Sequence, residues 1–432
     1  MNQKSNNKTN LFTDSLPKDW DVKPLKELIT FNLGRTPKRK EEKYWINGEI
    51  PWVSISDMVK FNTIYETKEL ISREALHSVF KNKLSKKGTL LMSFKLTIGR
   101  TSLLGIDATH NEAIISIYPR ESISKCFLLY YLPIVNYQNY MDRAIKGNTL
   151  NKSKIEKILV PLPSINEQKG IVKILNSIKK AKEQTVNVIS SVKYYKKSLL
   201  HHLFTYGPVP LDQRDAVELQ ETAIGLLPKE WIVKKLGKIA SMKSGGTPSR
   251  KNTMYWNGDI PWVKTGEINY TLILAAEEKI TAEGLENSSA RIIPKGTLLI
   301  AMYGQGITRG RVGILGIDAS INQACGAIFP SKEVLTEYLF FYLSHIYHEI
   351  RSLGHGANQR NLNSNIVKSL DIPIPSLAQQ KSIVEILRVV DKKVDAENNK
   401  KTALEELFRT LLGKLMTGQI RVNDLNLEEI QT

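Results

Sequence analysis

The chain has 432 residues, of which 41% are hydrophobic, and 61 Lys and Arg residues against 43 Asp and Glu residues give a formal net charge of +18. This length exceeds one typical domain and the apolar fraction can build more than one core, so we expect a globular, multidomain protein rather than a disordered one. The basic balance favours a polyanionic partner. Two cysteines, Cys126 and Cys325, are too few for a disulfide framework or a sulfur-rich metal site, which indicates a reducing, cytoplasmic setting.

Residues 1–12 open the chain with a segment rich in Asn and Lys. It has no apolar run, so it is neither a signal peptide nor a membrane anchor, and no later stretch is apolar enough to span a bilayer. We expect residues 1–12 to be disordered and assign them no role.

The rest of the chain is an internal duplication. Residues 47–53 read NGEIPWV and return as NGDIPWV at 257–263. Further collinear matches join 16–20 with 227–231, 87–91 with 295–299, 104–107 with 315–318, and 161–163 with 373–375. Because repeated segments define an architecture, each half is expected to be a globular domain followed by a long helix.

The two long helices are predicted at residues 164–206 and 376–418. Their apolar residues recur at steps of three and four, the heptad pattern of a coiled coil, and antiparallel pairing would place the two domains at opposite ends. An ordinary long helix packed on a core is the alternative interpretation. Capping signals mark both helices, Ser164 with Glu167 and Ser376 with Gln379 at the starts, and Gly207 and Gly418 at the ends.

The coiled-coil seam is predicted from the same periodicity. In the first helix it comprises Ile171, Ile174, Ile178, Ala181, Thr185, Val188, Val192, Tyr195 and Leu199. In the second helix it comprises Ile383, Leu387, Val390, Val394, Glu397, Lys401, Leu404, Phe408, Leu411 and Leu415.

The fold class is predicted to be α+β, with two pseudo-symmetric globular domains separated by an antiparallel coiled coil. Short β-rich runs at 89–94, 113–118 and 297–302 alternate with loops. Helical patterns follow at 124–145 and 332–353, and Pro133 is expected to bend or break the first. The expected boundaries are 13–163 for the first domain, 164–206 for the central helix, 207–227 for a linker, 228–375 for the second domain, 376–418 for the C-terminal helix and 419–432 for a tail.

Three pairs of loops differ between the copies, at 35–40 and 246–251, 94–100 and 303–311, and 147–151 and 356–361. They concentrate the side chains that bond phosphates and base edges, although ordinary solvated loops remain the alternative for any single residue. The DNA-binding candidates are Lys38, Arg39, Lys40, Lys95, Arg100, Asn148, Arg250, Lys251, Gln305, Arg309, Arg311, Asn358, Gln359 and Arg360. The recurring Trp45, Trp52, Trp256 and Trp262 are interpreted as packing residues rather than base-stacking platforms.

Signatures of catalysis are absent from the sequence. There is no phosphate-binding loop of the GxxxxGK[ST] form, and Gly304-Gln305-Gly306 lacks the third glycine of a dinucleotide fingerprint. The run 167–169, EQK, could pass for part of a nuclease motif, but helix capping explains it better. The histidines lack acidic or sulfur partners at metal-binding spacing. We interpret the chain as a binding scaffold without catalytic residues or a metal site.

Several stretches resemble one known family. They are GTPS at 246–249 leading to YWNGDIPW at 255–262, PKGT at 294–297, NQA at 322–324, IPIP at 372–375 and LMTGQIR at 415–421. Over nearly its whole length the chain resembles the specificity (S) subunit of Type I restriction-modification systems. The first half departs from the pattern, with LGR at 33–35 in place of a glycine pair and HNE at 110–112 in place of Asn-Gln.

This resemblance implies a division of labour. Two target-recognition domains would each read half of a gapped, asymmetric site in double-stranded DNA. Two methyltransferase subunits carrying S-adenosylmethionine would dock on the helices, and motor-nuclease subunits carrying ATP and Mg would complete the complex, while this chain would bind no cofactor. A nuclease with a diverged active site and a coiled-coil adaptor that binds no DNA are the alternatives.

Overall fold

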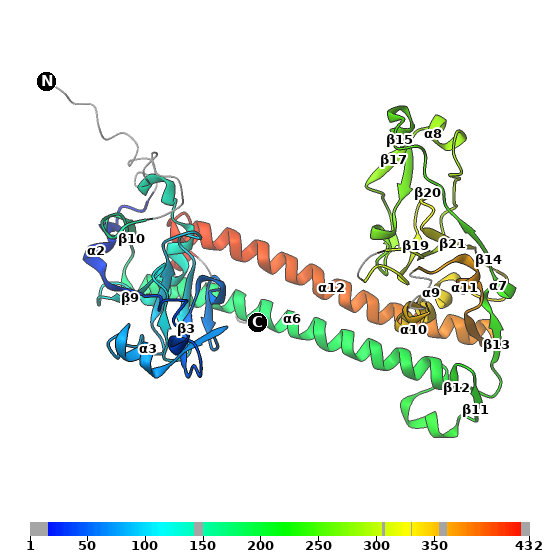
Figure 1. Cartoon of the computed structure of the whole chain (residues 1–432), viewed down its shortest axis with the longest axis horizontal. Helices are drawn as coiled ribbons and strands as arrows, with labels where there is room; N and C mark the ends of the chain where they lie inside the picture. The colour runs from blue at the N-terminus through cyan, green and yellow to red at the C-terminus, as the bar shows by residue number, and fades with distance from the viewer. Residues whose placement is uncertain (1–15, 142–149, 305–306, 330, 354–360, 425–432) are drawn as a thin grey trace. The chain divides into compact units, whose positions relative to one another are not determined.

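The computed structural model describes residues 16–141, 150–304, 307–329, 331–353 and 361–424. The chain forms two compact units, unit 1 (Met1–Thr185 with Lys400–Thr432) and unit 2 (Val186–Asn399). Each unit contains one globular domain and one end of each long helix, α6 (Ile165–Tyr206) and α12 (Leu377–Met416). Short strands and helices build both domains, in contrast to the continuous ribbons of α6 and α12 (Figure 1).

A five-stranded sheet forms the centre of unit 1, in the order β2 (Ile29–Leu33), β9 (Ile114–Pro119), β6 (Leu90–Ser93), β7 (Thr101–Leu104) and β4 (Asn62–Ile64). Its neighbours are antiparallel except β4 and β7, which are parallel. A second sheet has the order β5 (Glu69–Ile71), β3 (Ile50–Val53) and β8 (Thr109–His110). A ribbon joins β1 (Asp21–Pro24) to β10 (Leu159–Leu162).

The helices of unit 1 complete its core. They are α2 (Leu25–Leu28), α3 (Arg73–Ser78), α4 (Lys125–Tyr131), α5 (Lys152–Glu156) and the start of α6. The helix expected at 124–145 ends two residues before Pro133 and continues as 3-10 turns, because proline cannot donate a helical hydrogen bond. Apolar residues of the five-stranded sheet, α4, the start of α6 and the end of α12 share one core cluster.

Unit 2 repeats this topology. Its five-stranded sheet has the order β14 (Ser241–Ser244), β21 (Cys325–Phe329), β18 (Leu298–Ala301), β19 (Val312–Leu315) and β16 (Leu272–Ile273). The three-stranded sheet is β17 (Glu278–Ile280), β15 (Trp256–Val263) and β20 (Ser320–Ile321), and the ribbon is β13 (Ile232–Lys235) with β22 (Asp371–Ile374). Its short helices are α7 (Leu236–Ile239), α8 (Ala282–Glu286), α9 (Thr336–His345), α10 (Tyr347–Ser352) and α11 (Ser364–Lys368).

The segment 207–227, expected as a linker, has structure of its own. It contains a 3-10 helix, Leu211–Ala216, and most of a two-stranded hairpin of β11 (Leu219–Thr222) and β12 (Gly225–Pro228). The turn requires Gly225, which has φ +103°.

The long helices begin and end at the predicted capping residues. At the start of α12, the Gln379 backbone N–H donates to Ser376 Oγ over 3.3 Å and the Ser376 backbone N–H donates to Gln379 Oε1 over 3.2 Å, a reciprocal capping box. At the start of α6, the Glu167 backbone N–H donates to Ser164 Oγ, but the Glu167 carboxylate binds Trp20 and Arg421 instead. Gly207 and Gly418 follow the two helices with positive φ.

In each unit the segments of α6 and α12 pack antiparallel. In unit 1, Glu167 contacts Arg421 while Lys182, further along α6, pairs with Glu405 at 3.7 Å. Of the predicted seam, Ile171, Ile178, Ile383 and Val390 are buried, while Val192, Leu199, Leu404 and Leu411 are half-buried. Two further seam predictions are wrong, because Val188 and Tyr195 are 39% and 53% exposed and Ile189 is buried instead.

Candidate nucleic-acid interface

In unit 1 the predicted loops meet at one turn, residues 110–114, which we call the central turn. The backbone N–H of Phe94 donates to Ala113 O over 2.9 Å, and that of Leu150 donates to Phe94 O over 3.0 Å. Thr36 Oγ1 donates to the Glu112 carboxylate. These hydrogen bonds therefore hold three segments together at one edge of the domain: the loop that begins at residue 35, the loop that begins at residue 94, and the residues that follow 149.

Unit 2 has the same arrangement at its own central turn, residues 321–325. The backbone N–H of Met302 donates to Ala324 O over 2.8 Å, and that of Leu362 donates to Met302 O over 3.1 Å. Thr247 Oγ1 donates to Gln323, the counterpart of Glu112. Matched loops with different side chains thus converge on the same framework in both units.

The central turns themselves were not among the predicted site residues. In each, an asparagine side chain closes the turn, with Asn111 Oδ1 accepting from Ala113 N and Asn322 Oδ1 accepting from Ala324 N, both over 3.0 Å. The duplication carried a signal for them, because Asn recurs at matched positions beside an exposed Glu in one copy and an exposed Gln in the other.

Arg39 and its counterpart Arg250 belong to a tryptophan–arginine cluster in each unit. The Arg39 guanidinium lies 4.0 Å from the Trp45 ring centre and 4.9 Å from that of Trp52, and it pairs with Glu69. The two indoles meet edge to face at 5.2 Å, and Trp52 is 2% exposed. The interpretation of these tryptophans as packing residues is confirmed.

Unit 2 repeats the cluster. Arg250 lies 3.7 Å from the ring centre of Trp256 and 5.0 Å from that of Trp262, and it pairs with Glu278. Hydrogen bonds from Arg250, and then from Lys264, hold the pKa of the Glu278 carboxyl below its usual value. Both arginines remain about half exposed, so each combines a packing contact with a solvent-facing edge.

Three other predicted arginines are occupied inside their own domains. Arg100 Nη1 donates to the carbonyls of Ile55 and Met58 at 3.2 and 3.1 Å. Arg311 Nη1 donates to Asn269 Oδ1 at 2.8 Å. Arg309 is 9% exposed and donates to the Arg351 carbonyl at 3.2 Å, which corrects its assignment as a base-contacting side chain: in this conformation the guanidinium is buried.

The remaining basic candidates face solvent more freely. Lys38, Lys40 and Lys251 are exposed, Lys38 beside Glu41 at 3.0 Å, and Lys95 is half-buried against the Phe94 ring. The other candidates, Asn148, Gln305, Asn358, Gln359 and Arg360, lie outside the described residues.

Among the described residues, no group of three or more His, Cys, Asp or Glu side chains could hold a metal ion. None of the helices described is long and apolar enough to cross a membrane.

Comparisons with known proteins agree with this architecture. A family profile for the Type I restriction modification DNA specificity domain matches residues 17–191 and 228–406. The MjaIX Type I restriction enzyme specificity subunit of Methanocaldococcus jannaschii is 23% identical over 424 residues, covering 95% of this chain and 95% of the relative. The EcoR124I/EcoR124II specificity subunit of Escherichia coli is 31% identical over 173 residues, covering 38% of this chain and 41% of the relative.

Solved structures share the fold. The crystal structure of a Type I restriction-modification S subunit from M. genitalium has a TM-score of 0.54 at 16% identity and covers 92% of this chain and 96% of its own. A structure from a study of the assembly and conformational transition of a type I restriction-modification system has a TM-score of 0.62 at 16% identity and covers 94% and 99%. The profile matches most of the chain in two copies, one in each half. The chain therefore belongs to the family of Type I restriction-modification DNA specificity subunits, and is a non-catalytic subunit with two target-recognition domains.

Proposed function

We propose that this specificity subunit reads a gapped, bipartite DNA site, with one half-site read by each target-recognition domain. The observation that carries the proposal is the convergence of matched loops on a central turn in both units, with side chains that differ between the copies. A shared framework with different loop chemistry supports the reading of two different short sequences. The exposed Lys38, Lys40 and Lys251 are the described candidates for phosphate contacts.

The long helices are proposed to set the separation between the half-sites. They are 42 and 40 residues long, which is about 60 Å of helix each, or one to two turns of DNA. Their outer faces are proposed to receive methyltransferase subunits that bind S-adenosylmethionine, with motor-nuclease subunits supplying ATP- and Mg-dependent steps. This chain would then contribute sequence recognition and assembly.

Exchange of one domain tests the modular reading. Residues 21–162 of a relative with another target should replace those of this chain, so that β1 and β10 are exchanged as a pair while Asp19 and Glu167 remain. We expect only one half-site to change when methylated adenines are sequenced from cells with the complete system. Exchange of 232–374, which keeps β13 and β22 together, is the matched control and should change the other half-site only. A change in both half-sites from either exchange would refute modular reading.

Substitutions of two adjacent residues of unit 2, Arg250 and Lys251, distinguish a packing role from a DNA-contact role. Arg250→Ala should lower the free energy of unfolding of unit 2 by about 1 kcal/mol, because it removes a ring contact and a partly exposed ion pair. Lys251 is exposed and makes no ion pair with another described residue, so Lys251→Ala should leave stability unchanged. If Lys251 contacts a phosphate, Lys251→Ala should reduce the magnitude of the slope of log DNA affinity against log salt concentration by about 1.

Urea unfolding and DNA titration at several salt concentrations measure the two effects. Lys251→Arg keeps the charge and should retain the wild-type salt slope. The assignment would be reversed if Lys251→Ala lowered stability while Arg250→Ala changed only the salt slope.

A further inference from the structure

In both units the target-recognition domain is attached to a long helix by the same buried glutamine. Gln168 of α6 and Gln380 of α12 are fully buried, and each Oε1 accepts a backbone N–H from the residue at or next to the start of a domain helix, Ser124 at 2.8 Å and Leu335 at 2.9 Å. Each Nε2 donates to two backbone carbonyls, those of Ser122 and Pro163 in unit 1 and those of Glu333 and Pro375 in unit 2. This anchor is therefore common to both units.

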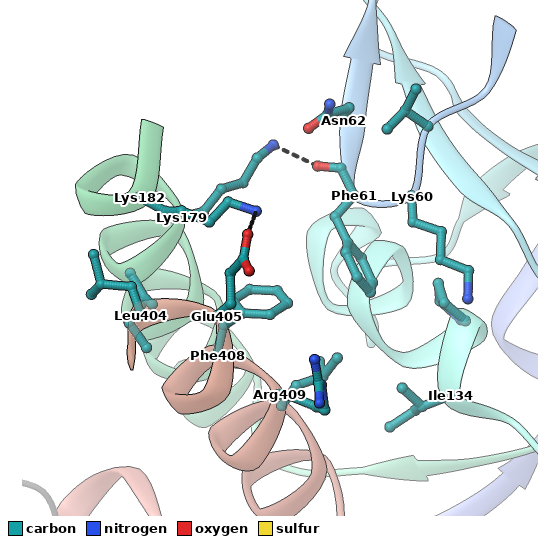
Figure 2. Close-up of a pocket in the computed structure, with 14 residues that line it drawn as sticks. Lys60, Phe61, Asn62, Ile134, Lys179, Lys182, Leu404, Glu405, Phe408 and Arg409 are labelled. Carbon is teal, nitrogen blue, oxygen red and sulfur yellow. Dashed lines mark hydrogen bonds and ion pairs between the residues drawn. The ribbon is translucent and has the colours of Figure 1, made fainter. Parts of the chain in front are cut away.

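In addition to this anchor, aromatic rings of the unit 1 domain pack against the long helices. Phe61, Tyr130 and Phe408 form a three-ring cluster with centroid separations of 5.3, 5.5 and 6.0 Å, which we call the aromatic contact. Tyr130 also donates its hydroxyl to Asn176 Oδ1 at 2.6 Å. A cavity of about 480 Å³ opens beside Phe61 and Phe408 (Figure 2).

Phe61 has a left-handed backbone, with φ +65°, which costs energy for a residue other than glycine. Lys179 of α6 donates to the Phe61 carbonyl at 2.7 Å, drawn as a dashed line in Figure 2. The ring cluster and this hydrogen bond hold the loop against the helices in unit 1, whereas the left-handed backbone itself recurs at the counterpart Tyr270 of unit 2, with φ +57°.

At the corresponding positions of unit 2, charged side chains form ion pairs in place of the aromatic contact. Following the duplication, Phe408 corresponds to Lys196, Lys179 to Asp391, and Asn176 to Arg388. Lys196 pairs with Asp391, and its Nζ lies 5.3 Å from the ring centre of Phe341, the counterpart of Tyr130. Arg388 Nη2 pairs with Glu337 Oε1 of α9 at 2.8 Å. We call these two pairs the ionic contact.

The two contacts should differ in their response to salt. The side chains of the ionic contact are 24% to 53% exposed, and partly exposed pairs weaken as the Debye length falls from about 10 Å at 0.1 M to about 3 Å at 1 M salt. Packing of apolar rings is not screened, and many salts strengthen it. The contact of α9 with the long helices in unit 2 is therefore more sensitive to salt than the contact of α4 in unit 1, which is a separate contact from the ion pairs of Arg421 with Asp19 and Glu167.

We propose that these contacts help to fix the orientation of each target-recognition domain on the helices, and that the α9 contact of unit 2 loosens as salt rises while the α4 contact of unit 1 does not. Lys196, Asp391 and Arg388 are then positioning residues that restrict which gap lengths are accepted. This consequence rests on the proposed reading of a bipartite site, whereas the difference between the contacts does not.

Hydrogen exchange of the full-length chain tests the contacts without DNA. Raising NaCl from about 0.1 M to about 0.5 M should speed exchange in α9 and leave α4 unchanged. The triple variant Lys196→Met, Asp391→Asn and Arg388→Gln removes both pairs of the ionic contact and should give fast exchange in α9 at both salt concentrations. Lys86→Met, which breaks an exposed pair with Asp107 that involves neither long helix, is the control and should behave as wild type. Equal responses of α4 and α9, or a salt response retained by the triple variant, would overturn the proposal.

DNA binding tests the consequence. The informative quantity is the ratio of affinities for the cognate gap and for a gap one base pair longer, because the salt dependence of phosphate contacts is common to both. We expect the ratio to fall about threefold with salt in the wild type, which is the loss expected from a partly exposed pair, and to be low and constant in the triple variant. A salt-independent ratio in the wild type would overturn the positioning role. Absence of any bipartite binding would instead contradict the proposed function, while hydrogen exchange would still decide the nature of the contacts.

Discussion

Removal of one heptad from each long helix is expected to shorten the accepted gap between the half-sites by about one to three base pairs, with both half-sites unchanged. Seven residues correspond to about 10 Å of helix, and base pairs are stacked about 3.4 Å apart. Each base pair removed also rotates one half-site around the DNA axis by about 34° relative to the other, which favours the smaller changes.

The register for this deletion follows from two ion pairs, Lys182 with Glu405 in unit 1 and Lys196 with Asp391 in unit 2. Both fit one antiparallel offset, so residues 186–192 and 395–401 are expected to face each other. Deleting both heptads turns the remaining seam by only about 20°.

Deleting five residues from each helix, 186–190 and 397–401, is the matched control. It shortens the helices less but turns their ends by about 140°, so specific binding should be lost. Sequencing of methylated adenines gives the gap, and circular dichroism establishes that the helices are retained. An unchanged gap in the folded heptad variant would contradict the proposal that the helices set the spacing.

The long helices could be predicted because their signals are local. The capping residues and terminal glycines lie within a few positions of each helix end, and α6 and α12 begin and end beside them. The prediction of the seam was wrong where the local sequence pattern was ambiguous. Val188 and Ile189 are both apolar neighbours, and only packing in the unit determines that Ile189 is buried and Val188 exposed.

The duplication also identified which loops differ between the copies, because differences stand out against a repeated framework; that their described parts meet at one turn in each unit was found only in the structure. The roles of single arginines could not be predicted. Arg39 is occupied by Glu69 and Arg309 by the Arg351 carbonyl, partners 30 and 42 residues away along the chain. Family membership contradicts both alternatives raised from the sequence, the diverged nuclease and the adaptor that binds no DNA.

Replacement of Arg421 by alanine is expected to lower the free energy of unfolding of unit 1 by about 2 kcal/mol, the scale of hydrogen bonds between charged groups. Arg421 Nε and Nη2 donate to Glu167 at 2.6 and 2.8 Å, and Nη1 and Nη2 donate to Asp19 at 2.9 and 2.7 Å. The Glu167 carboxylate also accepts from the Trp20 indole at 3.0 Å and is only 11% exposed. The segment after α12 is thereby tied to the start of the first domain and to the start of α6.

Unit 2 provides a neutral counterpart of this network. Gln379 replaces Glu167 and donates to Glu230 at 3.3 Å, and the buried Trp231 indole has no hydrogen-bond partner among the described residues. A second substitution, Glu167→Gln, should therefore restore part of the stability lost in Arg421→Ala, because it removes the carboxylate that would otherwise stay poorly compensated in a buried site. Each single variant should be less stable than the wild type.

Acid should weaken the same network. The hydrogen bond from Arg421 lowers the pKa of Asp19 below 3.8, so its contribution is present at neutral pH and is lost as pH falls below 3.8 and through the lowered pKa. Urea unfolding followed by hydrogen exchange in β1 and β10 would measure this loss in the wild type, and Arg421→Ala should show a smaller acid dependence. If Arg421→Ala had the same free energy of unfolding as the wild type, the network would not contribute to stability. If adding Glu167→Gln to Arg421→Ala restored none of the lost stability, the uncompensated Glu167 carboxylate would not explain the effect of Arg421→Ala.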